Sequence, residues 1–327
     1  MRGIMPYDII QRMTTIVAID IGGTQMRAAS FTSESIEPTK THKVPTLANE
    51  PGGFGRLTRL LEEIWPESND VAAVGIASPG PLDPHTGILL APPNNPEWHN
   101  FPLGPKLAEH FGVKVFLDND ANLAGLAEYR FGAGKGHDNV VYLTVSTGIG
   151  GGVIVNGKLL QGFHGLGAEL GHTIVEPEGA LCPCGHKGHL EAYSSGTAIA
   201  KYMLEEMEAG AGSSLSREGL TAEAIKEAAS KGDALSIQAF ERAGKYLGIG
   251  VANFLHIFDP SIVIFGGGVS RAGNLLFDPF YKSLNQHVFH PRYLENLEFA
   301  AAKLGDDSGL LGARALAEIK LETLTGM

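Results

Sequence analysis

Cysteine is nearly absent from this sequence of 327 residues, which contains only Cys182 and Cys184. A disulfide between two cysteines separated by one proline would be strained, and so few cysteines cannot brace a secreted scaffold. Long hydrophobic runs are absent as well, so we expect no transmembrane helix, since one needs about 18 or more apolar residues. The first 12 residues lack the apolar core of a signal peptide. We therefore expect a soluble, cytoplasmic protein with no membrane partner.

Basic residues are in deficit: 25 Lys and Arg stand against 36 Asp and Glu, for a net charge of −11. An acidic surface repels phosphate backbones, so we expect no nucleic-acid partner. Hydrophobic residues make up 43% of the chain, which is enough to build sizeable cores and excludes a disordered protein. At about 150 residues per domain, the length predicts roughly two domains.

Strands and helices alternate along the chain, and glycine, with 43 residues, is abundant. Runs rich in β-branched apolar residues predict strands at residues 16–19, 71–76, 113–117, 140–145 and 262–265. Helical apolar periodicity covers residues 54–65, 121–131, 197–207, 221–230, 235–258 and 309–324. This alternation predicts an α/β protein in which helices cover mixed sheets.

Two segments share one plan of strand, glycine-rich turn and strand: residues 16–30 and residues 140–157. The repetition suggests a duplicated architecture with two halves facing each other across a cleft. Two unrelated hairpins remain the alternative, because glycine-rich turns between strands are common.

Three glycine-rich turns could bind phosphate or nucleoside groups. In residues 20–24, Asp20 precedes two glycines and Thr24; glycines let backbone N–H groups approach phosphate, and a carboxylate can hold hydrated Mg²⁺. Residues 146–152 offer hydroxyl and N–H groups, and residues 266–268 suit an adenine or ribose. Each turn has an ordinary structural interpretation, but together they favour a nucleotide held between two halves.

A polar cluster, Asp118-Asn119-Asp120-Ala121-Asn122, follows the strand predicted at residues 113–117. Such a position often holds only a helix N-cap, which accounts for one of these residues. α/β proteins also place ligands at the carboxyl ends of strands. A carboxylate there can accept a proton from a hydroxyl that attacks a γ-phosphate, and Asn119 can bond to sugar hydroxyls.

Histidines surround the two cysteines in the sequence: His172, His186 and His189 lie within a short window of Cys182 and Cys184. Thiolates and imidazoles at such spacing predict a tetrahedral zinc site. A site filled by four protein ligands has no open position for water, so the metal would be structural. Reduced core cysteines with unrelated histidines are the alternative.

These motifs together resemble the ROK family of sugar kinases and sugar-responsive regulators, and the glucokinase-type branch most of all. The motifs that carry the resemblance are Asp20-Ile-Gly-Gly-Thr24, Gly75-Ile-Ala-Ser-Pro-Gly80, Asn119-Asp-Ala-Asn122, Thr147-Gly-Ile-Gly-Gly-Gly152, Glu169-Leu-Gly-His172, the cysteine segment up to Glu191, and Gly266-Gly-Gly268. The resemblance implies a two-lobed actin-like ATPase (ribonuclease H-like) fold with a cleft between lobes. It places one lobe at residues 14–118 with 307–327 and the other at residues 119–306.

The resemblance also implies a role for each matching residue. Asp120 is expected to be the general base that activates the 6-hydroxyl of the sugar. The hexose-binding residues it implies are Asn94, Asn119, Asp120, Glu169, His172 and Glu191. The ATP-binding residues it implies are Asp20, Gly22, Gly23, Thr24, Thr147 and Gly148 at the phosphates, with Gly267 and Gly268 near adenosine.

The cysteine segment departs from the family pattern, which joins an upstream histidine to three cysteines. His189 stands where the family has its last cysteine. The expected structural Zn²⁺ site is therefore His172, Cys182, Cys184 and His189, with His186 as the reserve ligand. Imidazole binds zinc at about 2.0–2.1 Å, against about 2.3 Å for sulfur. His172 would then face zinc with one ring nitrogen and the sugar with the other.

The resulting expectation is a glucokinase that uses ATP with Mg²⁺ and forms a homodimer. Kinases for mannose, fructose, N-acetylglucosamine or N-acetylmannosamine stay open, as does polyphosphate as the donor. A sugar-sensing ROK regulator is the alternative from another class. The short stretch before Ile16 and the acidic charge argue against its DNA-binding module.

Overall fold

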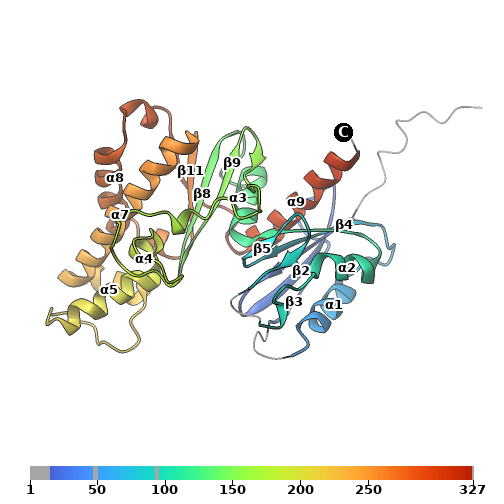
Figure 1. Ribbon diagram of the computed structural model, residues 1–327, viewed down its shortest axis with the longest axis horizontal. Helices are drawn as coiled ribbons and strands as arrows, with labels where there is room; N and C mark the ends of the chain where they lie inside the picture. The colour runs from blue at the N-terminus through green and yellow to red at the C-terminus, as the bar shows by residue number, and fades with distance from the viewer. Residues whose placement is uncertain (1–14, 47–50, 93–95, 326–327) are drawn as a thin grey trace, which may run out of the picture. The chain divides into compact units, whose positions relative to one another are not determined.

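The computed structural model describes residues 15–46, 51–92 and 96–325, and the chain divides into two compact units. The first unit comprises the described residues up to Ala127, Gly162–Leu166 and the C-terminal segment from Asp306. The second comprises Glu128–Gln161 and Gly167–Gly305. Each unit is built on a five-stranded mixed sheet (Figure 1), so the expected α/β class is confirmed. The domain boundaries expected from the sequence stay a prediction.

The first unit has the strand order β3-β2-β1-β4-β7, in which β2 is antiparallel to both neighbours and the β1, β4 and β7 strands are parallel. Its strands are β1 (Thr15–Ile21), β2 (Gln25–Thr32), β3 (Lys40–Pro45), β4 (Val71–Ser78) and β7 (Lys114–Asn119), with a short hairpin of β5 (Leu82–Asp83) and β6 (Ile88–Leu89). Its helices are α1 (Gly53–Ile64), η2 (Pro96–Trp98), α2 (Leu103–Phe111) and α9 (Ser308–Thr325), and α3 (Asp120–Phe131) and η6 (Gly305–Asp307) run across the division between the units.

The second unit repeats this plan with the order β10-β9-β8-β11-β12 and the same pattern of antiparallel and parallel pairs. Its strands are β8 (Val140–Val145), β9 (Ile149–Val155), β10 (Lys158–Leu159), β11 (Ile262–Gly266) and β12 (Glu298–Ala301). Its helices are η3 (Leu170–His172), α4 (Glu191–Ser194), α5 (Gly196–Glu208), α6 (Ala222–Ser230), α7 (Ala234–Phe258), η4 (Val269–Ala272), α8 (Asn274–His287) and η5 (Pro291–Leu294). The shared topology supports duplication over two unrelated hairpins.

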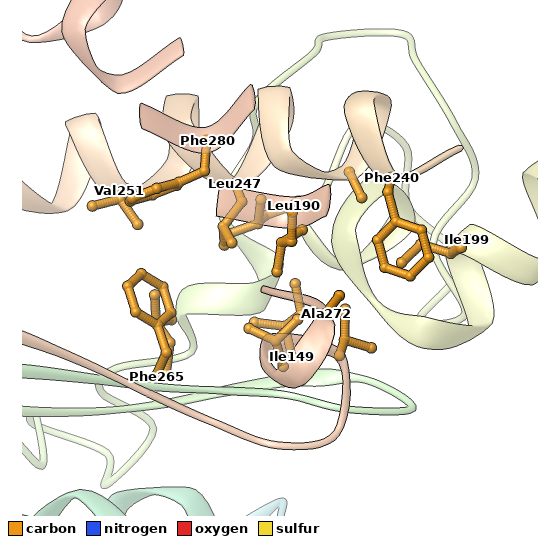
Figure 2. Packing of buried hydrophobic residues seen from close by; sticks show 14 of the residues in the cluster. Ile149, Leu190, Ile199, Phe240, Leu247, Val251, Phe265, Ala272 and Phe280 are labelled. Atoms are coloured by element: carbon orange, nitrogen blue, oxygen red, sulfur yellow. The ribbon is translucent and has the colours of Figure 1, made fainter. Parts of the chain in front are cut away.

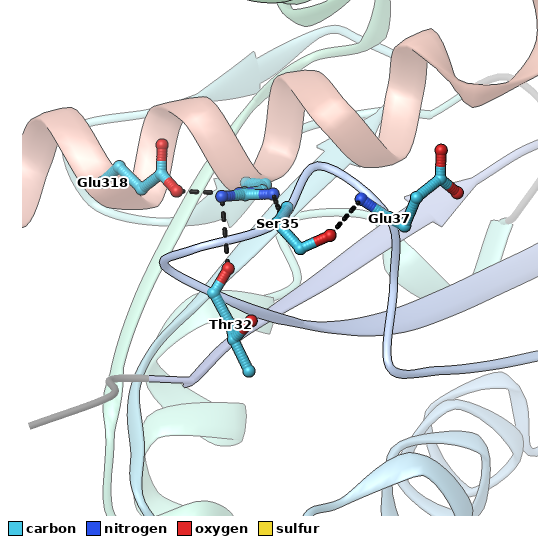
Figure 3. A network of polar contacts seen from close by, with 5 residues as sticks. Thr32, Ser35, Glu37 and Glu318 are labelled. Carbon is cyan, nitrogen blue, oxygen red and sulfur yellow. Dashed lines mark hydrogen bonds and ion pairs between the residues drawn. The ribbon is translucent and has the colours of Figure 1, made fainter.

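Helices cover both faces of the first sheet because β1 alternates its buried side chains between them. Val17 and Ile19 pack in one cluster with residues of α1 and α2, whereas Ile16 packs with Ala317 of α9 on the other face. α9 is fixed further by Arg314, whose side chain is only 5% exposed. Arg314 pairs with Glu318 at 2.7 Å and donates to the carbonyl oxygens of Thr32 and Ser35 (Figure 3).

The core of the second unit lies between its sheet and the long helices α7 and α8. Figure 2 shows Leu247, Val251 and Phe280 of these helices near Phe265 and Ile149 of the sheet. None of the helices in the described ranges combines the length and apolar character needed to cross a bilayer.

A buried carboxylate secures the point where the chain leaves α3. Glu128 has no accessible surface, and its two oxygens accept backbone N–H bonds from Ala133, Lys303 and Leu304, each at 2.8 Å. The end of α3 is thereby tied to the segment that leads from β12 back to α9.

Candidate active site

The first unit brings three of the predicted motifs to one edge of its sheet. In the parallel register, Asp20 pairs with Ala77 and Ala77 pairs with Asp118, so the β1 turn and the β7–α3 junction follow the same ends of their strands. Ser78, within the motif Gly75–Gly80, pairs with Asn119. This edge, where parallel strands end, is the usual ligand-binding position in α/β sheets.

Asp20 is held in an ionic network. Its carboxylate accepts a bond from Arg27 at 2.5 Å, and Arg27 also donates to the carbonyl oxygen of Asp306. A Cβ at Gly309, in the first turn of α9, would lie 2.6 Å from the Asp20 carboxyl carbon, so the carboxylate rests on the positive end of that helix. Asp20 is therefore a fixed negative charge next to a cation and a helix start.

The turn after Asp20 presents its tip to solvent. The Gly22 N–H is used within the hairpin, bonding to the Gln25 carbonyl at 2.9 Å, and the Gly22 carbonyl accepts from the Thr46 hydroxyl at 2.6 Å. Gly23 and Thr24 are exposed. The expected phosphate-binding groups at the tip are thus accessible on a turn whose base is fixed.

The three residues Asp118, Asn119 and Asp120 at the start of α3 have different surroundings. The Asn119 side chain caps the helix, accepting from the N–H of Ala121 at 2.9 Å and of Asn122 at 3.3 Å. Asp118 has no accessible surface and accepts from Asn119 N and Asn122 Nδ2. The cap is therefore an asparagine, and Asp118 is buried among local bonds. Asp120 is the exposed carboxylate at this junction, and its Oδ1 accepts the Ala121 N–H at 2.8 Å.

In the second unit, two glycine turns follow the ends of β8 and β11, which are parallel neighbours. Gly267 has φ +85°, and a Cβ there would lie 2.3 Å from the Val145 carbonyl oxygen, so only glycine fits this close approach. The Thr147 carbonyl accepts from the Thr197 hydroxyl at 2.7 Å, which fixes the turn after β8 to α5.

A cavity of about 300 Å³ opens beside these two turns. Its polar lining includes Thr147, Thr197 and Lys226, and its apolar lining includes Leu220, Ala222 and Val269; Gly268 lines it as well. Such a volume lies in the range of small-molecule pockets, about 300–1,000 Å³. The sequence predicted Thr147 and Gly268 here, but it gave no sign of the residues from α5 and α6. Nothing in those helices' local sequence distinguishes a pocket-lining position from an ordinary surface position.

Glu191 connects the turn after β8 to the cysteine segment. Its Oε2 accepts the Ile149 N–H at 2.8 Å, and a Cβ at Gly148 would lie only 2.6 Å from the same oxygen. Its Oε1 lies 3.7 Å from the Cys182 sulfur. A predicted sugar-binding residue thus lies against both a predicted phosphate turn and one of the predicted metal ligands.

The four residues expected to bind zinc come together. The ligand atoms of His172, Cys182, Cys184 and His189 all lie within 4.8 Å of one another. His172 Nδ1 and His189 Nδ1 are 3.3 Å apart, and the Cys184 sulfur lies 3.2 Å from His189 Nδ1. Tetrahedral zinc bonds imply nitrogen–nitrogen and nitrogen–sulfur separations of about 3.3 and 3.6 Å. The donor set therefore fits zinc, and His186 is outside it.

The protonation chemistry of this cluster also suits a cation. Burial raises the pKa of the Cys182 thiol to about 12. Burial lowers the pKa of His189, as do the neighbouring His172 and His186, which favours the neutral imidazole that can act as a ligand. Both cysteines are free, as the strained spacing predicted. A metal ion would supply the positive charge that a buried thiolate needs.

Of the two remaining predicted sugar ligands, Glu169 lies within the described residues and Asn94 does not. Glu169 is exposed and lies immediately before η3, whose last residue is His172. Because His172 points Nδ1 toward the cysteine cluster, its Nε2 is the ring nitrogen left for another partner. Asn94 lies outside the described residues.

Comparison with known proteins gives concordant matches. Residues 16–320 match the ROK family. A glucokinase of Thermotoga maritima is 42% identical over 308 residues, covering 92% of this chain and 96% of the relative. The ROK hexokinase structure from Thermus thermophilus matches with a TM-score of 0.83 and 33% identity, over 95% of this chain and 100% of that one.

A ROK family glucokinase from Streptomyces griseus, solved in complex with glucose and AMPPNP, matches with a TM-score of 0.75 and 36% identity, over 93% of this chain and 99% of that one. These structures confirm the two-lobed actin-like ATPase fold expected from the sequence. The chain belongs to the ROK family.

Proposed function

We propose that this protein is an ATP-dependent glucokinase that transfers the γ-phosphoryl group to the 6-hydroxyl of glucose. The observation that carries the proposal is the match, over nearly the whole of both chains, to glucokinases, one of them solved with glucose and an ATP analogue. The polar residues that follow the strand ends of each sheet are of the types that such a reaction requires.

ATP is the proposed donor because the cavity beside Thr147 has an apolar side. Leu220, Ala222 and Val269 suit a flat base, whereas a polyphosphate chain has no apolar group to place there. The hydroxyl and backbone groups of the Thr147–Gly148 turn would contact the phosphates, with Gly267 and Gly268 near adenosine. Polyphosphate is the alternative donor, and the activity assay below compares it with ATP.

The turn after β1 carries the other phosphate contacts of the proposal. The accessible tip at Gly23 and Thr24 would donate to phosphate oxygens, and Asp20 would hold hydrated Mg²⁺. The carboxylate and its fixed position fit such a cation. When bound, Mg²⁺ neutralises charge on the transferred phosphoryl group.

Asp120 is the proposed general base. It is exposed at the first turn of α3, where its Oδ1 accepts the Ala121 N–H at 2.8 Å, whereas Asp118 is fully buried. A carboxylate that takes the proton of the 6-hydroxyl as the oxygen attacks phosphorus raises the nucleophilicity of that oxygen. The proposed sugar contacts are Asn94, Asn119, Glu169, His172 and Glu191.

The cysteine cluster would hold a structural Zn²⁺ through His172, Cys182, Cys184 and His189. Four protein ligands complete a tetrahedral shell, so the metal would brace the segment that carries His172 and leads to Glu191 rather than activate water. We also propose that the protein is cytoplasmic and forms a homodimer, as expected from the sequence. Light scattering of the purified protein tests the dimer.

A coupled ADP assay with a panel of sugars and donors tests the activity. We expect glucose with ATP to give the highest kcat/KM; a preference for mannose, fructose or an N-acetylhexosamine would replace the substrate, and a preference for polyphosphate would replace the donor. Absence of any sugar-dependent ADP release, together with retention on DNA, would favour the regulator instead.

The role of Asp120 is tested by Asp120→Asn. We expect kcat to fall by about 10²–10⁴-fold, because the amide cannot accept the proton, while glucose binding measured by calorimetry is retained. Asp278→Asn, at an exposed aspartate on α8, is the control. Near-normal turnover in Asp120→Asn would remove this residue from the mechanism.

A further inference from the structure

An arginine in the N-terminal half of α7 is surrounded by tyrosine rings. The Arg242 guanidinium lies 4.5 Å from the ring centre of Tyr193 and 4.8 Å from that of Tyr202. The ring centres of Tyr193 and Tyr246 are 3.9 Å apart, and the Arg242 guanidinium lies 5.7 Å from the ring centre of Tyr246. Cations over aromatic faces attract the rings electrostatically, so the three tyrosines and the arginine form one stack.

The stack reaches the cysteine loop, defined here as residues 174–189. The Tyr193 hydroxyl oxygen accepts the Ala180 N–H at 2.6 Å, and the Tyr246 hydroxyl donates to Glu176 at 3.3 Å. A Cβ at Gly179 would lie 1.8 Å from the Tyr193 oxygen, so the loop backbone lies directly against this hydroxyl. Tyr193 also packs in one apolar cluster with Cys182.

The same stack reaches Glu191 through the short helix α4. Tyr193 is two residues from Glu191 on this helix, and the hydroxyl of Ser194, the next residue, donates to the Ala243 carbonyl on α7 at 2.8 Å. α4 and the cysteine loop are therefore fixed to one place on α7, and Arg242 lies at that place.

We propose that Arg242 is a positioning residue: by holding the rings of Tyr193 and Tyr246 it fixes the cysteine loop and Glu191, and so sets the affinity for glucose. The statement about glucose rests on the proposed function, whereas the statement about the loop stands without it. Arg242 acts through the tyrosines and is assigned no contact with substrate.

The two cysteines give a direct measurement, because the chain has no others and both lie in the loop. Cys184 is exposed and Cys182 is buried, so a thiol reagent such as dithionitrobenzoate should react in a fast and a slow phase with the full-length protein. The rates are measured both as purified and after treatment with a chelator, so that bound metal does not decide the difference. The slow phase reports on how firmly the loop covers Cys182, and zinc release can be followed in the same reaction.

Arg242→Met keeps the apolar stem and removes the cation. We expect the slow phase to accelerate about tenfold and KM for glucose to rise about tenfold, the size of effect found when supports of metal ligands are removed. KM for ATP should stay at its wild-type value. Arg242→Lys keeps a cation over the rings and should restore most of both properties. Arg292→Met, at an exposed arginine on η5, is the control.

A wild-type slow phase in folded Arg242→Met would overturn the proposal. Should that variant fail to fold, Tyr193→Phe provides the test, because it keeps the ring and removes only the acceptor for the Ala180 N–H. An unchanged slow phase in Tyr193→Phe would also contradict the proposal. If neither the wild type nor any variant phosphorylates glucose, the proposed function fails. The rates of the thiol reaction would still test the role of Arg242 in fixing the loop.

Discussion

Gly148 is a residue where a single hydrogen atom in place of a side chain controls the position of a neighbour. The Glu191 carboxylate occupies the space that a Cβ at this position would take, at 2.6 Å, and bonds to the adjacent Ile149 N–H. A carboxylate at the end of a flexible side chain can move away at small cost in stability. Its position relative to the turn, however, would be lost.

We therefore predict that Gly148→Ala separates activity from stability. The methyl group should displace Glu191 and lower kcat/KM for glucose by about 10- to 100-fold, since misplacement of a positioning group by about 1 Å has effects of that size. The melting temperature should change little. Gly212→Ala, where no atom lies within 4 Å of the new methyl group, should change neither quantity. Equal activities of the two variants would contradict the prediction.

Among the elements, α7 depends on a capping residue that also holds a distant loop. The Asp233 carboxylate accepts the Ser236 N–H at 2.8 Å at the start of α7, and the Ser214 N–H at 2.6 Å and Ser213 hydroxyl at 3.0 Å from the loop after α5. Burial raises the pKa of this carboxyl, but the hydrogen bonds lower it by more, so the pKa lies below its ordinary value.

A lowered pKa means that the folded state favours the ionised form, so its stabilisation is present at neutral pH and is lost as the pH falls below the ordinary carboxyl pKa of about 3.9. We predict that Asp233→Ala costs about 1 kcal/mol of unfolding free energy at pH 7, and that the cost shrinks toward pH 3. Urea unfolding followed by circular dichroism measures it. Thr221→Ala removes the cap of α6, which does not titrate, so its cost should not vary with pH in this way. A pH-independent cost for Asp233→Ala would refute the linkage.

Elements with strong local patterns were predictable from the sequence. The runs at residues 16–19 and 140–145 became β1 and β8, and the long periodicity at 235–258 became α7. The sequence did not predict α8, which contains Pro279, or β12, a four-residue edge strand whose pairing depends on β11. Their formation is decided by tertiary packing rather than by local preference.

The candidate site shows the same division. Asp120 and the cysteine cluster could be found because each is compact in the sequence. The cavity beside Thr147 and the stack around Arg242 could not, because their residues come from separate helices and meet only after folding.

At the scale of the whole molecule, the two units have separate hydrophobic cores, and tryptophan fluorescence belongs to only one of them. Both tryptophans, Trp65 and Trp98, lie in the first unit, whereas the four residues of the metal cluster lie in the second. Tryptophan fluorescence therefore reports the unfolding of the first unit, and circular dichroism reports both. Proteins with several compact units need not unfold in one transition, so the two probes can differ.

This difference makes removal of the metal informative. A ligand bound only to the folded state stabilises it by mass action, and a unit of this size loses roughly 2–4 °C of melting temperature per kcal/mol. We predict that prolonged treatment with a chelator lowers the melting temperature seen by circular dichroism by about 5–10 °C and shifts the tryptophan transition less. Added zinc should reverse the effect, and His189→Ala should show the lowered transition before any chelator is added, because it lacks one ligand. Equal shifts in both probes would mean that the two units unfold in one cooperative transition, contrary to the prediction. No shift in either would mean that the cluster holds no metal in solution.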